Sequence, residues 1–212
     1  MDKVKKVAII GGTGKVGRHI ASRALEKGYQ VRMLVRSPKK LTSHDARIEI
    51  VEGDVRNLED IQKLLTDCQI VISTFGQPLK EEPIYSSVTE NILKIMSDLK
   101  ITRYIGVTGG SLTINGDKKS LLNKIGANVF EIVYSKMMSD KKNEWIILNR
   151  NTSIQWTLIR LPFIDEGKEK GFIKENLTDM PGTKITNNDI ATFIIQQIDH
   201  PKYVHKAPFI SN

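Results

Sequence analysis

Cysteine is nearly absent from this chain of 212 residues. The single one, Cys68, excludes an intrachain disulfide framework and any zinc or iron–sulfur site built from several cysteines. Long apolar runs are missing too, because no segment approaches the roughly 18 apolar residues that indicate a membrane-spanning helix. The N-terminal apolar run is too short for a secretory signal, and no cleavage site follows it. We therefore expect a soluble, cytoplasmic protein with no membrane partner.

Metal-ligand spacing and basic stripes are also missing. The four histidines show no ligand spacing such as H-x-x-x-H, so no metal is expected. The formal net charge is +8, yet the lysines are scattered and are not interleaved with aromatic residues. The basic surface is therefore interpreted as solvated, with no nucleic-acid partner, although its charge favours anionic small molecules.

The composition is that of an ordinary globular domain. Hydrophobic residues make up 40% of the chain and charged residues 26%, which excludes disorder and fibrous repeats. No internal repeat or linker divides the sequence, so we expect one domain over residues 1–212. The oligomeric state stays open between a monomer and a small homo-oligomer.

Strand and helix signals alternate along the chain. Short apolar runs rich in β-branched residues predict strands at 6–10, 31–35, 47–51, 70–73, 104–107 and 154–160, with a terminal extended piece at 208–211. Apolar residues at helical spacing predict helices at 15–27, 58–65, 88–96, about 130–148 and 187–198. The segment before the last helix is interpreted as a loop. This alternation predicts an α/β fold, a doubly wound parallel sheet in a three-layer αβα arrangement.

A glycine-rich segment, residues 11–17, follows the first expected strand and opens the first expected helix. Gly11 allows a tight turn, Gly14 lets the backbone approach a pyrophosphate, and Gly17 lets helix and strand pack together. Free N–H groups at the helix N-terminus then face the phosphates. This context predicts a dinucleotide-binding turn.

The same segment does not fit a P-loop. Val16 stands where Ser or Thr is needed, and Ile9 stands where the first glycine is needed. We therefore keep the dinucleotide interpretation, in which Thr13, Lys15 and Val16 also belong to the cofactor-binding turn.

The end of the second expected strand distinguishes the two nicotinamide cofactors. A protein that uses NAD places Asp or Glu there, to hold the ribose 2′-OH. This chain has Arg36 and Ser37, with Lys39 and Lys40 close by. An arginine pairs with a 2′-phosphate in a bidentate way, and a serine hydroxyl adds a hydrogen bond. The predicted cofactor is therefore NADP, with NADPH preferred over NADH.

These residues, together with the segments Leu-Val-Arg-Ser-Pro at 34–38, Gly-Asp-Val at 53–55 and Arg-Leu-Pro at 160–162, match a known family pattern. Over essentially its whole length the chain resembles the atypical short-chain dehydrogenases/reductases. More narrowly, it is similar to the NAD(P)H-binding, NmrA-like group, which contains biliverdin-IXβ/flavin reductases and bacterial proteins provisionally named NADH-flavin reductases. The resemblance implies a Rossmann-like fold.

The resemblance also implies which residues surround the cofactor. Asp54 and Val55 would lie along the adenine. The other implied residues follow the fourth, fifth and sixth strands, the last two groups lying at the nicotinamide: Thr74, Phe75 and Gly76; Thr108 and Gly109; Pro162, Phe163 and Ile164.

Two departures from the family pattern bear on the chemistry. Many relatives use a Tyr-x-x-x-Lys pair as a proton relay, but none of the five tyrosines here has a lysine four residues later; Tyr134 has one at the wrong spacing. Biliverdin-IXβ reductases carry Thr-Ser where this chain has Thr108 and Gly109, which argues against tetrapyrrole reduction. Thr108 and Ser111 remain the candidate catalytic residues, with a loop or helix-cap serine as the alternative for Ser111.

The function predicted from the sequence is an NADPH-dependent oxidoreductase. It would transfer hydride to a small flat conjugated acceptor, a flavin or quinone-like molecule. The missing tyrosine–lysine pair leaves open a non-catalytic NADP(H)-binding redox sensor of the NmrA-like type. The same absence disfavours an isomerase or epimerase.

Overall fold

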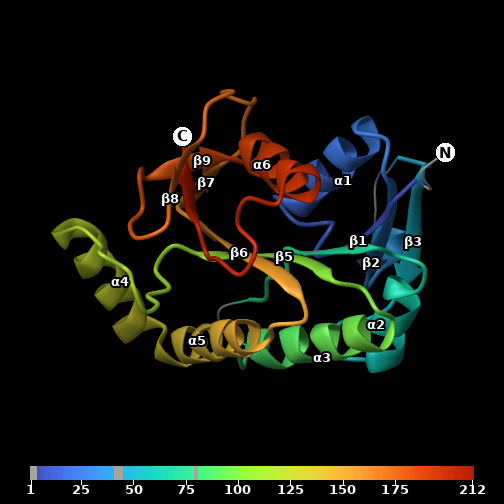
Figure 1. Cartoon of the computed structure of the whole chain (residues 1–212), viewed down its shortest axis with the longest axis horizontal. Coiled ribbons are helices and arrows are strands. Elements are labelled where there is room, and N and C mark those ends of the chain that lie inside the picture. Colours follow the sequence, from blue (N-terminus) through green and yellow to red (C-terminus); the bar gives the residue numbers. More distant parts are fainter. Residues whose placement is uncertain (1–3, 41–44, 79–80) are drawn as a thin grey trace.

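The computed structural model describes residues 4–40, 45–78 and 81–212. Its central feature is an eight-stranded sheet in the order β3-β2-β1-β4-β5-β6-β10-β8, and β7 and β9 form a separate two-stranded sheet (Figure 1). The domain expected over 1–212 includes residues 1–3, 41–44 and 79–80, which lie outside the described part.

The elements alternate much as the hydrophobic pattern predicts. The strands are β1 (Lys6–Ile10), β2 (Gln30–Val35), β3 (Ile48–Glu52), β4 (Ile70–Ser73), β5 (Arg103–Gly109), β6 (Gln155–Leu161), β7 (Phe163–Asp165), β8 (Lys174–Asn176), β9 (Lys184–Thr186) and β10 (Phe209–Ser211). The helices are α1 (Gly17–Glu26), the 3-10 turn η1 (Pro38–Lys40), α2 (Leu58–Leu65), α3 (Tyr85–Asp98), α4 (Leu121–Val133), α5 (Ser135–Arg150) and α6 (Asn187–Asp199).

Strand β1 is an interior strand of the sheet and pairs in parallel with both β2 and β4. Val7 is opposite Val31 on one side and Ile70 on the other, and all three side chains are buried. The chain first builds the sheet from β1 toward β3 and then crosses back to place β4 on the other side of β1. The strand order therefore reverses between β1 and β4, which makes this the topological switch point.

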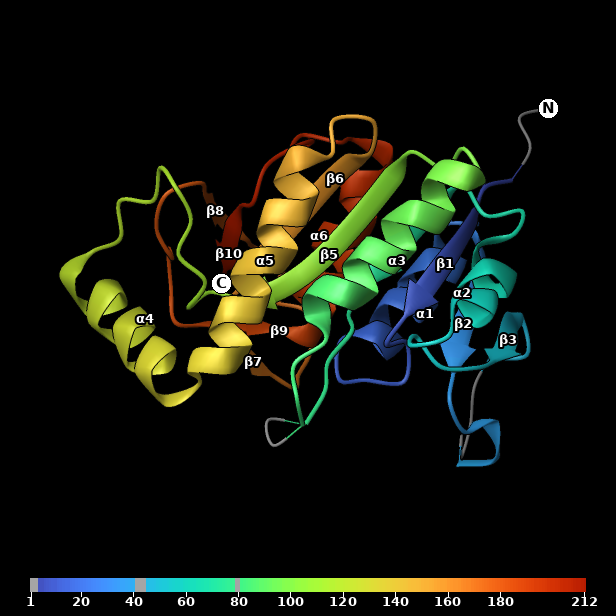
Figure 2. The same cartoon turned by 90° about the horizontal axis from the view of Figure 1, so that it is seen from below.

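Helices cover both faces of the sheet (Figures 1 and 2): α1 and α6 lie on one face, and α2, α3 and α5 on the other. Helix α1 buries Ile20, Ala21, Ala24 and Leu25, one stripe at helical spacing that faces the sheet. The doubly wound, Rossmann-like αβα fold is confirmed. Among the described residues, no helix combines the length and the apolar character needed to cross a membrane.

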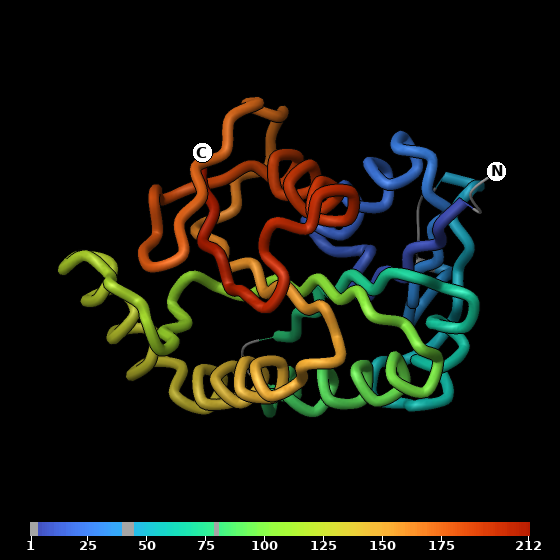
Figure 3. The backbone as a smooth tube through the Cα atoms, in the orientation of Figure 1, coloured from blue at the N-terminus to red at the C-terminus, as the bar shows by residue number. Residues whose placement is uncertain are grey.

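The structure corrects the sequence prediction in two regions. The single helix expected at about 130–148 is two helices, α4 and α5, because the backbone breaks at Tyr134 with φ −121° and ψ 43°. The expected loop before α6 contains β7, β8 and β9. Strand β8 runs antiparallel to β10, and the path of the chain brings the C-terminal residues back beside β6 (Figure 3). Each of these strands has three residues, too few to show a local period.

Candidate functional site

The β1–α1 turn has its shape because of its glycines. Gly11 has φ +76°, and a Cβ on it would lie 2.4 Å from the Thr74 carbonyl oxygen. A Cβ on Gly17 would lie 2.2 Å from the Gly11 carbonyl oxygen, which also accepts the Gly14 N–H at 3.0 Å. Positions 11 and 17 therefore require glycine, and the turn packs closely against the end of β4.

The N-terminus of α1 beside this turn suits an anion. The residue before the helix is Val16, which offers no side-chain cap, and the first turn contains no acidic residue. The first N–H groups of a helix lack intrahelical partners, and the helix dipole favours negative charge there. Backbone N–H groups and dipole together can hold a phosphate.

A cleft of about 530 Å³ opens at the carboxyl ends of β1, β2, β3 and β4. It lies beside the switch point, where sheets of this kind bind ligands. Its walls come from the loops after these strands and from the start of α3: Ile10, Gly11, Thr13, Leu34, Val35, Arg36, Ser37, Gly53, Asp54, Val55, Arg56, Phe75, Gly76, Gln77, Pro78, Glu81 and Ile84.

The fold gathers most of the predicted cofactor residues at this cleft. Those that line it follow four different strands: Gly11, Thr13, Arg36, Ser37, Asp54, Val55, Phe75 and Gly76. Gly14, Lys15, Val16 and Gly17 form the adjoining turn and the start of α1. Thr74 ties the turn to β4, because its hydroxyl donates at 3.1 Å toward the carbonyl oxygens of Ile10 and Gly11.

The remaining predicted residues lie further along the sheet, at the ends of β5 and β6. Thr108 is buried, whereas Phe163 is 70% exposed on β7. None of this group lines the cleft described above: Thr108, Gly109, Ser111, Pro162, Phe163 and Ile164. The cleft therefore corresponds to the predicted adenine, phosphate and 2′-phosphate contacts, and the predicted nicotinamide end is built from different strands.

Two arginines line the cleft, and they differ in whether a carboxylate already pairs with them. Arg36, exposed at the end of β2, makes no ion pair with a carboxylate anywhere in the described residues. Arg56, which sequence reasoning missed although it comes two residues after Asp54, is 3.4 Å from the Glu81 carboxylate. Its backbone N–H also donates to Asp54 Oδ1 at 2.9 Å. Arg36 is therefore the cation of the cleft that stays available for an anionic ligand.

A buried lysine that the sequence gave no reason to select lies next to Thr108. The Lys141 ammonium, on α5, is 3.3 Å from the Thr108 hydroxyl oxygen and 3.7 Å from the Tyr85 ring centroid. Tyr85 in turn contacts the cleft residue Phe75 edge to face, with ring centroids 5.5 Å apart. Burial lowers the pKa of Lys141. A polar cluster thus stands directly behind the cleft wall. Within the described residues, no three His, Cys, Asp or Glu side chains gather as a metal would require.

Glu144, one helical turn after Lys141, is buried in the same cluster. Its Oε1 accepts a hydrogen bond from the Thr89 hydroxyl at 3.0 Å, while its Oε2 has no hydrogen-bond partner among the described residues. Burial raises the pKa of Glu144 to about 7, against the opposing effect of Lys141. The folded protein therefore keeps this carboxyl protonated at mildly acidic pH.

This raised pKa predicts a pH-dependent stability. As the pH rises from 4.5 to about 7, the unfolded chain releases the Glu144 proton and the folded chain retains it, so the free energy of unfolding falls. Glu144→Gln removes the titration and keeps an oxygen for Thr89. The variant should gain about 2 kcal/mol relative to wild type between about pH 5 and pH 8 in urea unfolding. Glu90→Gln, at an exposed position of α3, is the control, and an equal change in both variants would contradict the prediction.

The candidate Ser111 lies in the loop after β5 and is half-buried. Its hydroxyl is 3.6 Å from the Met138 sulfur, and its carbonyl oxygen accepts from the Lys119 ammonium at 3.2 Å. Tyr134 lies at the α4–α5 break, with its ring 5.6 Å from the Phe130 ring. No titratable side chain that could act as a base is hydrogen-bonded to the Ser111 hydroxyl among the described residues.

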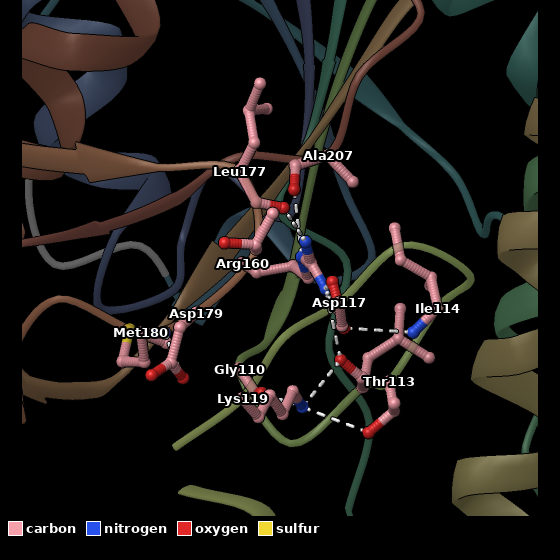
Figure 4. A network of polar contacts seen from close by, with 12 residues as sticks. Gly110, Thr113, Ile114, Asp117, Lys119, Arg160, Leu177, Asp179, Met180 and Ala207 are labelled. Carbon is pink, nitrogen blue, oxygen red and sulfur yellow. Dashed lines mark hydrogen bonds and ion pairs between the residues drawn. The ribbon is translucent and has the colours of Figure 1, made fainter.

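A buried polar network holds this loop in place (Figure 4). The Arg160 guanidinium, at 0% exposure, donates to both carboxylate oxygens of Asp117 at 2.8 and 2.7 Å. It also donates to the Ala207 and Leu177 carbonyl oxygens. The Lys119 ammonium donates to three consecutive loop carbonyl oxygens, those of residues 110, 111 and 112, and burial lowers its pKa to about 8. These contacts fix the backbone around Ser111.

Comparison with known proteins agrees with the sequence pattern. A family model described as NAD(P)H-binding matches residues 11–201. The uncharacterized protein YwnB of Bacillus subtilis (strain 168) is 28% identical over 207 residues, which cover 93% of this chain and 94% of YwnB.

Solved structures match the fold across the whole chain. A short-chain dehydrogenase/reductase from Veillonella parvula DSM 2008 in complex with NADP superposes with a TM-score of 0.81 at 16% identity, over 99% of this chain and 95% of that one. A protein from Streptococcus pneumoniae TIGR4 with the provisional name NADH-flavin reductase superposes with a TM-score of 0.79 at 22% identity, over 98% and 99% of the two chains.

Proposed function

The chain belongs to the NAD(P)H-binding family, and from this premise we propose that it is an NADPH-dependent oxidoreductase. In this proposal it transfers hydride to a flat conjugated acceptor, a flavin or a quinone-like molecule. The observation that carries the proposal is the cleft at the β1–β4 switch point, which has the glycine turn at one end and Arg36 among its lining residues.

The residues of the cleft fit the parts of a dinucleotide. The uncapped N-terminus of α1 and the turn at residues 11–17 suit the pyrophosphate, since a side chain at Gly11 or Gly17 would collide with the backbone. Asp54 and Val55, after β3, would border the adenine. When bound, the cofactor supplies the hydride, and the protein supplies orientation and shelter from water.

Arg36 and Ser37 support the preference for NADPH. Both line the cleft at the end of β2, the position from which an acidic residue would hold the 2′-OH of NAD. The Arg36 guanidinium has no carboxylate partner within the described part of the chain. An unpaired guanidinium at this point suits a dianionic 2′-phosphate and offers less to a neutral ribose hydroxyl.

The proposed acceptor rests on the aromatic residues and on one structural relative. Phe163 is exposed on β7, beside Pro162 and Ile164 at the predicted nicotinamide end, and Phe75 follows β4, between that end and the cleft it lines. A planar ring system could stack against such side chains, so proximity and orientation would carry the catalysis. The Streptococcus pneumoniae protein with the provisional name NADH-flavin reductase supports a flavin as the first acceptor to assay.

We expect no side chain to be indispensable as a general acid. A flavin or quinone accepts hydride at an electron-poor ring and can take its proton from water, and no base contacts Ser111 in the described structure. Ser111→Ala and Tyr134→Phe should therefore each keep kcat with FMN and NADPH within about tenfold, less than the roughly 10²–10⁴-fold loss for removing a general acid. A loss beyond about a thousandfold in either variant, with unchanged NADPH affinity, would make that residue catalytic.

Steady-state turnover tests the proposal itself. Purified protein should oxidise NADPH when FMN or a quinone is added, and the rate should saturate with both substrates. Tight binding of NADP(H) without turnover of any acceptor would instead support the alternative, a redox sensor that regulates a partner. Failure to bind NADP(H) at all would overturn both.

A further inference from the structure

Helix α4 projects from one end of the molecule and is nearly uncovered (Figures 1 and 2). Only Ala127 of its thirteen residues is buried. Its exposed apolar side chains are Leu121, Leu122, Ile125, Val129, Phe130, Ile132 and Val133. Leu122 and Ile132 are 82% and 79% exposed, so large aliphatic side chains of this helix stand open to solvent.

The exposed residues form a seam at coiled-coil spacing. Leu122, Ile125, Val129 and Ile132 are separated by three, four and three residues, the a/d pattern of a two-helix interface. Ala127, the buried residue of the helix, falls on the side opposite this seam. The helix therefore contacts the rest of the protein through the Ala127 side and leaves the seam exposed. The polar anchors Asn123, which donates to Asp179, and Glu131, which pairs with Lys142, lie on the sides away from the seam.

We propose that α4 is a dimerisation helix whose seam packs against α4 of a second copy of this chain, in antiparallel orientation. A two-fold axis level with Ala127 places Leu122 against the partner's Ile132 and Ile125 against the partner's Val129. Each layer then joins two large aliphatic side chains, and the same patch is used by both copies, as a closed dimer requires. Antiparallel packing also opposes the two helix dipoles.

The composition and charge of the seam favour a second copy over other occupants. Its four residues are all large, aliphatic and exposed, at 82%, 52%, 52% and 79% for Leu122, Ile125, Val129 and Ile132, so the same seam on a second copy would remove apolar surface from water on both chains. The helix has one basic residue, Lys124, and one acidic residue, Glu131, so two copies meet without local repulsion. A membrane-surface helix would instead be rich in Lys and Arg on its polar face. The helix does not cover the cleft described above, because α4 lies at the opposite end of the sheet from β2 and β3 (Figure 1).

The solution mass tests the proposal. Light scattering or sedimentation of wild type should give twice the chain mass of 23.9 kDa at micromolar concentration. Leu122→Lys and Ile132→Glu should each shift the protein to a folded monomer, because both side chains are solvent-exposed in the single chain. The unfolding temperature should fall only by what the loss of the dimer removes. Phe172→Lys, at an exposed apolar residue outside α4, is the matched control and should stay dimeric.

Mixing the two seam variants tests the orientation. In an antiparallel pair, Lys at 122 of one chain faces Glu at 132 of the other, and the second layer keeps Leu122 against Ile132. An equimolar mixture should therefore recover a dimer that neither variant forms alone. Failure of the mixture to associate would overturn the antiparallel arrangement. A monomeric wild type, a dimer that survives Leu122→Lys, or a wild-type monomer that instead sediments with anionic phospholipid vesicles would overturn dimerisation through α4.

Discussion

Replacing Asp117 by alanine is expected to lower the free energy of unfolding by about 3–5 kcal/mol, the range for removing one partner of a buried ion pair. The Asp117 and Arg160 side chains are 2% and 0% exposed, and their contacts are 2.7 and 2.8 Å. Without the carboxylate, the guanidinium remains charged where water cannot solvate it. The expected result is a protein that unfolds at a much lower urea concentration.

The surroundings of Arg160 cannot replace the lost carboxylate. Its other N–H groups already donate to the Ala207 and Leu177 carbonyl oxygens, and its planar group stacks 3.5 Å from the Phe209 ring centroid. These partners carry no net charge. Lys119, close by, loses the carboxylate that favours its own charged form, so the substitution leaves two cations in the cluster.

A surface pair supplies the control. Glu82 pairs with Lys136 and both side chains are 76% exposed, so Glu82→Ala should cost about 1 kcal/mol or less. Asp117→Asn, which keeps an acceptor oxygen and loses the charge, should fall between the two and remains measurable if the alanine variant does not fold. Equal losses in the free energy of unfolding for Asp117→Ala and Glu82→Ala would show that the buried pair contributes no more to stability than the surface pair.

Arg36→Ala is expected to weaken NADPH binding by roughly 10- to 150-fold and to leave NADH binding almost unchanged, because a hydrogen bond to a charged group contributes about 1.5–3 kcal/mol. The guanidinium lines the cleft without a carboxylate partner among the described residues. Its loss therefore removes an interaction that only the 2′-phosphate of NADPH can make. Equilibrium titration of both cofactors by fluorescence gives the two affinities.

Arg56→Ala is the matched control for this experiment. Arg56 lines the same cleft, but its guanidinium is already 3.4 Å from the Glu81 carboxylate. We expect the variant to change the affinities for NADPH and NADH by the same factor. An equal loss of both cofactors in Arg36→Ala would mean that Arg36 is structural, and a wild type that prefers NADH would overturn the cofactor proposal.

Much of the fold was predictable because its causes are local. The apolar run at residues 6–10 predicts a buried parallel strand, and the glycines at 11–17 predict a tight turn after it. The structure has both. The expected helix at about 130–148 was wrong for a local reason as well: Tyr134 breaks the backbone without Gly or Pro. The apolar residues of α4 also continue the helical period of the sequence although they face solvent.

The candidate site likewise contains some residues that the sequence could place and others that it could not. Residues directly after a strand, such as Arg36, Asp54 and Phe75, could be placed from the sequence, because carboxyl ends of parallel strands meet at one edge of the sheet. Lys141 beside Thr108 could not, because the two residues are separated by 33 positions and meet only when α5 packs on β5.

The sequence by itself determined the doubly wound fold, the glycine turn at residues 11–17 and the edge of the sheet where the cleft opens, since backbone preference and the period of hydrophobic residues act over a few neighbouring positions. Only the tertiary structure decided that Arg160 pairs with Asp117, that Glu144 is buried with a pKa near 7, and that α4 stands away from the body. These features depend on which distant segments of the chain pack together and exclude water. The spacing of residues along the chain does not show which segments those are.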